Sequence, residues 1–168
     1  GTIEYGVGHL HTPLLVIMGH TKCGAVAAAA TEAHVEGHVA PLVERIEPAV
    51  ARAAAANPGA RGADLVPAAV RENVWQSIFD LLRNSRECRS LAREGRLTVV
   101  GAVCDIATGK IEWMGPHPWQ SELVEAFGTE SDDHANPTAR AEPSPDQPAP
   151  PADALAGAPR DEDHEQHP

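Results

Sequence analysis

Two side chains with metal-binding chemistry stand three positions apart near the start of the chain. They are His20 and Cys23, in the segment Gly19-His20-Thr21-Lys22-Cys23-Gly24. An imidazole and a thiolate are both ligands that zinc favours in proteins. Two ligands are only half of a tetrahedral site, however. The spacing alone therefore leaves open a second interpretation, a loop histidine beside a small buried cysteine.

The sequence around this pair predicts a strand, a short loop and a helix. Residues 14–18 are all apolar and lie between Pro13 and Gly19, a pattern typical of a parallel strand that is buried on both faces. Residues 25–30 are mostly Ala and favour a helix. The loop of such a unit lies at the carboxyl end of the strand, where open α/β sheets bind ligands. We expect His20 and Cys23 at that edge.

The rest of the pattern predicts an α/β fold with a mostly parallel sheet flanked by helices. Four further helices are predicted, at residues 2–10, 39–56, 64–84 and 85–94. Thr2 is expected to cap the helix over 2–10, and Pro67 to lie in the first turn of the helix over 64–84. A second buried strand is expected at 96–104, then a turn at 107–110 and an antiparallel return at 111–114.

Composition divides the chain into a domain over residues 1–127 and a tail over 128–168. The tail holds ten acidic residues, two basic residues and eight of the fifteen prolines, whereas residues 1–127 hold 14 acidic and 11 basic residues. Such a tail has too little apolar surface to offset its ordering entropy, so we predict that it is disordered. Its histidines lie among carboxylates, and we expect no defined metal site there: His134, His164 and His167.

Several classes of protein are excluded by what the sequence lacks. No stripe of Lys and Arg offers a face for nucleic acid, and no apolar run approaches the length of a membrane span. A nucleotide-binding α/β domain is disfavoured because neither glycine-rich phosphate motif occurs. Three sparse cysteines suit a reducing compartment, so we expect a cytoplasmic protein. The chain has no initiating Met, and we expect that sequence precedes Gly1.

With these elements in place, the chain resembles the β-class carbonic anhydrases. In that family a strand ends in a G-H-x-x-C-G segment, which residues 19–24 match. Three further blocks match the family in order over roughly residues 1–123: Thr2-Ile3-Glu4-Tyr5-Gly6-Val7, Glu72-Asn73-Val74 and the run from Val100 to Trp113. Four blocks in order are far more specific than one H-x-x-C.

The resemblance implies zinc-dependent, reversible hydration of carbon dioxide to bicarbonate, with His20 and Cys23 as zinc ligands. The family's third protein ligand and a catalytic Asp/Arg pair belong to an upstream C-x-D-x-R segment, which this sequence does not contain. The catalytic residues are therefore not assigned. The alternative is a non-catalytic zinc-binding or structural relative. The resemblance also implies a homodimer or a larger homo-oligomer, and similar domains occur fused behind membrane anion transporters.

Other residues in the matching blocks are expected to be structural. Cys104 is read as a small buried strand residue, and Cys88 has no ligand spacing to anything. Gly24 is expected to let the backbone pass close to the metal. A structural role is also expected for Glu4, Tyr5, Asn73 and Asp105.

Overall fold

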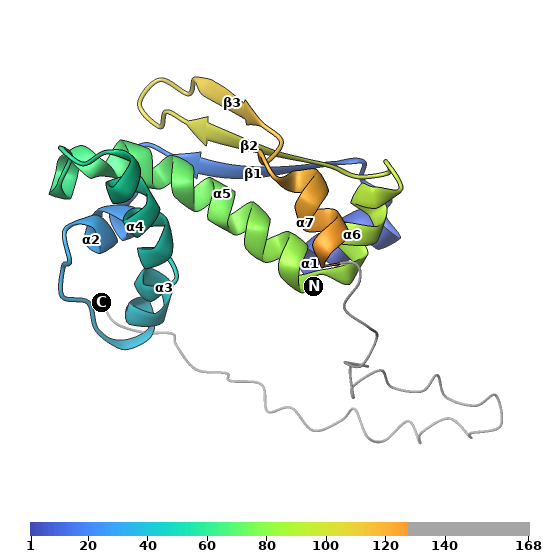
Figure 1. Ribbon diagram of the computed structural model, residues 1–168, viewed down its shortest axis with the longest axis horizontal. Coiled ribbons are helices and arrows are strands. Elements are labelled where there is room, and N and C mark those ends of the chain that lie inside the picture. The colour runs from blue at the N-terminus through green and yellow to red at the C-terminus, as the bar shows by residue number, and fades with distance from the viewer. Residues whose placement is uncertain (128–168) are drawn as a thin grey trace, which may run out of the picture. The chain divides into compact units, whose positions relative to one another are not determined.

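The computed structural model describes residues 1–127 (Figure 1). The predicted boundary at 127/128 and the predicted tail lie outside the described residues. The elements follow one another as α1 (Thr2–Glu4), the π-helix η1 (Tyr5–His9), β1 (Leu14–His20), α2 (Gly24–Ala30), the 3-10 helix η2 (Gly37–Val39), α3 (Ala40–Glu44), α4 (Glu47–Ala56), the 3-10 helix η3 (Gly62–Leu65), α5 (Val66–Asn84), α6 (Arg86–Arg93), β2 (Thr98–Cys104), β3 (Ile111–Gly115) and α7 (Gln120–Ala126).

The strands in this part of the chain form one mixed sheet in the order β1-β2-β3. β1 and β2 pair in parallel, with Leu14 beside Thr98 at one end and His20 beside Cys104 at the other. β2 and β3 pair antiparallel, as the predicted turn required. Helices and a sheet with a parallel strand pair confirm the predicted α/β class.

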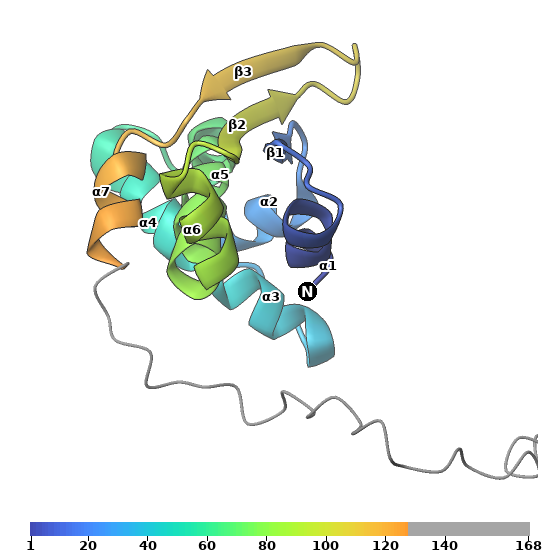
Figure 2. The same cartoon turned by 90° about the vertical axis from the view of Figure 1, so that its right-hand side faces the viewer.

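Helix α5 is the main support of the sheet. Its buried residues recur every three or four positions, which makes one apolar stripe: Ala69, Val70, Val74, Ile78 and Leu82. A Cβ atom on Gly19 or Gly101 would lie 2.8 Å or 2.9 Å from a methyl group of Val74, so these two glycines let α5 approach β1 and β2 closely. Figures 1 and 2 both show the helices on one side of the three strands.

The opposite face of the sheet is not covered within residues 1–127. Side chains alternate along a strand, so the neighbours of Gly19 and Gly101 point away from α5. On this open face Leu14, Met18 and Trp113 expose 48%, 49% and 62% of their surface. The prediction that β1 is buried on both faces is therefore wrong for the described residues, because α5 packs on one face only.

Two helix predictions also need correction. The helix expected over 39–56 is divided into α3 and α4, because Pro48 lacks the amide that a continuous helix would need and sits instead in the first turn of α4. Thr2 is not the cap of the first helix, since Gly1 holds that position. Helix α7 was not predicted from the sequence, whereas Pro67 does lie in the first turn of α5 as predicted.

None of the helices in this part of the chain is long and apolar enough to cross a membrane.

Candidate metal centre

The loop between β1 and α2 carries both predicted metal ligands. His20 is the last residue of β1, and Cys23 is the N-cap of α2 with an extended backbone (φ −66°, ψ 114°). Between them, Lys22 adopts a positive φ of 57°, which is uncommon for a residue other than glycine and closes the turn. The strand, loop and helix form as predicted, so both residues lie at the carboxyl edge of the parallel pair.

His20 is exposed, and its ring is oriented by a neighbouring carbonyl. Its Nδ1 lies 3.0 Å from the carbonyl oxygen of Thr21. A carbonyl only accepts hydrogen bonds, so Nδ1 carries the proton and the lone pair of Nε2 is free to bind a metal. Metal-binding histidines generally have such a partner on the second ring nitrogen.

Cys23 has a free thiol and is half-buried, with its side chain packed against the edge of the hydrophobic core. Gly24 follows it, and a Cβ atom there would meet no protein atom within 4 Å. The protein alone therefore imposes no steric demand for glycine at this position. The expected close approach of the Gly24 backbone to a metal stays a prediction.

The other two cysteines differ sharply in their surroundings. Cys88 is fully buried near the start of α6, and burial raises the pKa of its thiol above the ordinary value of 9.0. Cys104 is the register partner of His20 on β2 and lies on the same open face of the sheet. It is half-buried rather than buried as expected, because no helix covers that face in residues 1–127.

The donor set fits zinc in kind but falls short in number. His20 and Cys23 supply the nitrogen and sulfur ligands that zinc prefers. Among residues 1–127, however, no three His, Cys, Asp and Glu side chains gather closely enough to hold a metal ion. The described residues thus offer a pair of ligands, where catalytic zinc sites usually have three from protein.

The hollows of this part of the protein lie elsewhere. One hollow, of about 910 Å³, is lined by residues of α2, α3, α4 and η3, many of them alanines. A second hollow of about 420 Å³ is aromatic, with Trp75, Phe79, His117 and Trp119 in its wall. Neither includes His20 or Cys23. The metal-binding loop is therefore an open edge and not the floor of either hollow.

Three of the residues expected to be structural make contacts with neighbouring residues away from the metal-binding loop. Glu4 accepts a hydrogen bond of 2.7 Å from the Ser85 hydroxyl and so ties α1 to the start of α6. Tyr5 is exposed and stacks on His9 with 5.0 Å between ring centres. Asn73 lies within α5, where its carbonyl accepts a side-chain hydrogen bond from the next turn. None of these contacts involves the β1–α2 loop.

Comparison with known sequences gives consistent matches. The family model described as carbonic anhydrase matches residues 1–111. The carbonic anhydrase of Mycolicibacterium smegmatis is 32% identical over 116 residues, which are 67% of this chain and 54% of the relative. Carbonic anhydrase 2 of Mycobacterium tuberculosis is 31% identical over 115 residues, 66% of this chain and 53% of that protein. The chain thus spans about half the length of the curated relatives it matches.

Solved structures agree in fold. The b-carbonic anhydrase CafA of Aspergillus fumigatus superimposes with a TM-score of 0.64 at 26% identity, over 76% of this chain and 62% of that one. One of two β-carbonic anhydrases from Sordaria macrospora, described as tetrameric, gives a TM-score of 0.58 at 24% identity, over 67% of this chain and 57% of its own.

Proposed function

The chain belongs to the β-class carbonic anhydrase family, and on that basis we propose that it contributes the zinc-binding loop of an enzyme that hydrates carbon dioxide reversibly to bicarbonate. One observation carries the proposal. His20 and Cys23 both lie in the loop at the carboxyl edge of β1, and the hydrogen bond at His20 Nδ1 leaves Nε2 free for the metal. Zinc is the metal that suits this pair of donors.

In this proposal the loop binds and orients, and further groups complete the site. His20 binds through Nε2 and Cys23 through Sγ. A zinc ion bound by these two residues would supply an activated water nucleophile at neutral pH, because zinc lowers the pKa of bound water to about 7. In this proposal the third ligand and the Asp/Arg pair that the resemblance implies come from outside the described residues.

A metal-binding measurement tests the ligand assignment. Equilibrium dialysis of the full chain against Zn²⁺, and against Co²⁺ as a coloured probe, should show binding that His20→Ala and Cys23→Ser each reduce to background, since removing one of two protein ligands collapses affinity. Cys104→Ser is the matched control and should retain the metal. Metal lost from the Cys104 variant but kept in the Cys23 variant would overturn the assignment.

A second candidate function is a non-catalytic zinc-binding or structural role. The observation that favours it is that no three potential ligands gather within residues 1–127. The two candidates share the metal-binding loop and differ in the turnover of the intact gene product, so a hydration assay and a metal analysis of that protein separate them.

We also propose that the chain pairs with a second copy and resides in the cytoplasm. The open sheet face supports pairing, because Leu14, Met18 and Trp113 expose 48%, 49% and 62% of their surface on it. In addition, β1 has no strand on its outer side among residues 1–127. All three cysteines are free thiols, which supports a reducing compartment. Sedimentation of the chain and of Trp113→Lys should show association that the charge weakens. A monomeric wild-type chain would contradict the pairing.

A further inference from the structure

Thr21, between the two proposed ligands, is anchored to a part of the chain 85 residues away. Its hydroxyl oxygen accepts a hydrogen bond from the Ile106 amide at 3.2 Å. Its own amide donates to the carbonyl of Cys104 at 2.9 Å. Cys104 ends β2 and Ile106 lies in the connection to β3. One residue thus fastens the metal-binding loop to the β2–β3 turn through both its backbone and its side chain.

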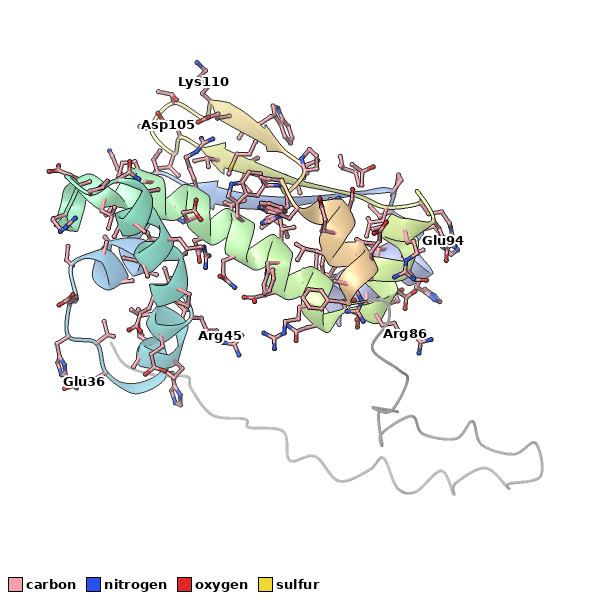
Figure 3. All side chains as sticks on the ribbon, in the orientation of Figure 1. Glu36, Arg45, Arg86, Glu94, Asp105 and Lys110 are labelled. Atoms are coloured by element: carbon pink, nitrogen blue, oxygen red, sulfur yellow. The ribbon has the colours of Figure 1, made fainter. Side chains whose placement is uncertain are left out.

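The turn that receives this anchor is itself well fixed. The Asp105 carboxylate accepts hydrogen bonds from the amides of Ala107 at 2.8 Å and Thr108 at 3.4 Å. These bonds lower the pKa of Asp105 below its ordinary value of 3.8, and the bond from Ala107 has the largest effect. The carboxylate therefore stays ionised and can accept both hydrogen bonds. Backbone bonds join Asp105 to Lys110 and Gly109 at 2.8 Å and 2.7 Å. Figure 3 shows Asp105 and Lys110 at this turn.

The loop has reason to need such an anchor. Lys22 holds a positive φ of 57° directly after Thr21, a conformation that side-chain-bearing residues rarely adopt unless the surroundings impose it. The carbonyl of Thr21 is also the partner of His20 Nδ1, at 3.0 Å. Any movement of the residue 21 backbone would therefore release the imidazole whose orientation the metal site requires.

We infer that Thr21 is a positioning residue of the zinc site: its hydroxyl, held by the Ile106 amide, fixes the carbonyl that sets the tautomer of His20. The metal-binding part of this inference rests on the proposed function. The tautomer part does not, because it concerns the metal-free protein. Thr21 touches neither substrate nor metal and acts through His20.

The test compares four full-length chains: wild type, Thr21→Val, Thr21→Ser and Thr108→Val. Valine is close to threonine in shape but has no acceptor, whereas serine keeps the hydroxyl. Thr108→Val is the matched control, since the Thr108 hydroxyl accepts the Lys110 amide at 3.3 Å in the same turn without contacting residue 21. Far-UV circular dichroism of each metal-free chain verifies that it is folded.

Two readouts are expected to move together. Long-range ¹H–¹⁵N NMR spectra of the imidazoles should show His20 as the Nδ1–H tautomer in wild type, Thr21→Ser and Thr108→Val, and a rise of the Nε2–H form in Thr21→Val. Titration with Zn²⁺ should show a Kd about 10- to 100-fold weaker in Thr21→Val, and within about threefold of wild type in the other two.

The outcomes separate the two claims. An unchanged His20 tautomer and unchanged Zn²⁺ affinity in Thr21→Val would overturn the inference alone, and so would equal losses in Thr21→Ser. A wild-type chain that has the Nδ1–H tautomer but binds no Zn²⁺ would overturn the proposed function, while a tautomer shift in Thr21→Val would still support the positioning role.

Discussion

The two faces of the three-stranded sheet differ in almost every respect. On the α5 side, Val99 is fully buried and Gly19 and Gly101 admit the helix to close contact. On the other side, Leu14 and Met18 are about half exposed. The packed face buries the side chains that α5 and the strands share. The open face carries His20 and Cys104, so the side of the sheet that lacks a cover is the side with the proposed metal chemistry.

This difference separates a core that is complete within the described residues from a metal-binding loop that is not. The core around α5 is fully hydrogen-bonded: in the described residues no buried side-chain N or O atom lacks a hydrogen-bond partner. The metal-binding loop is anchored by Thr21. It offers only two of the three protein ligands that a catalytic zinc site usually has, and its two ligands line neither of the hollows described above. Structure and chemistry are thus supported by different parts of the molecule.

The largest expected effect is on the packed side. Ile78 of α5 is fully buried, so Ile78→Ala should lower the free energy of unfolding by about 2–5 kcal/mol through lost burial and a residual cavity. Leu14→Ala on the open face should cost about 1 kcal/mol or less, since half of the Leu14 surface is already exposed. Urea unfolding of both variants gives the comparison. Equal losses would mean that the open face is covered in solution.

A smaller effect is expected where α5 approaches the strands. A Cβ atom on Gly19 would lie 2.8 Å from a Val74 methyl and 3.0 Å from a Val70 methyl, so Gly19→Ala should cost about 1–3 kcal/mol by overpacking. Gly24→Ala, whose Cβ meets no protein atom within 4 Å, is the matched control and should be neutral or slightly stabilising in its helix. Urea unfolding measures both. A neutral Gly19→Ala would show that the helix–sheet contact is looser than described.

The smallest effect concerns His117, which packs edge-on against Trp75 of α5. Burial lowers the pKa of His117 below its ordinary value of 6.5; nearby Glu72 raises it and Arg52 lowers it by smaller amounts. The unfolded chain therefore binds the proton more readily, and stability is lost as pH falls through 6.5. His117→Asn can keep an acceptor for the Trp119 amide but does not titrate.

Thermal melts of wild type and His117→Asn between about pH 7.5 and about pH 5.5 test this. The stability advantage of wild type should narrow as the pH falls. A constant difference would show that His117 is as well solvated as a free histidine.

Much of the fold was predictable because it follows from the local pattern of apolar residues. The apolar run before Gly19, the stripe along α5 and the hairpin after Cys104 each follow from short-range periodicity. Pro48 did signal the break between α3 and α4, but the apolar spacing across it hid the signal. Helix α7 has Leu123, Val124 and Phe127 at helical spacing, a pattern short enough to be passed over.

The sequence predicted which residues could bind the metal, but not the contacts that hold them in place. A histidine and a cysteine three residues apart can be read from the sequence, but the Thr21–Ile106 bond joins residues 85 positions apart and depends on the register of β1 and β2. The exposure of β1 depends equally on what packs against the sheet. Such long-range geometry has no local signature.

The most direct test of the account is turnover and metal content of this chain expressed alone. Stopped-flow hydration of carbon dioxide with added zinc, and metal analysis after dialysis, should show no enzymatic rate and zinc that dialysis removes, because residues 1–127 supply His20 and Cys23 without a third ligand. Robust turnover with about one tightly held zinc per chain would contradict the account and would point to a further ligand within the chain or its partner copy.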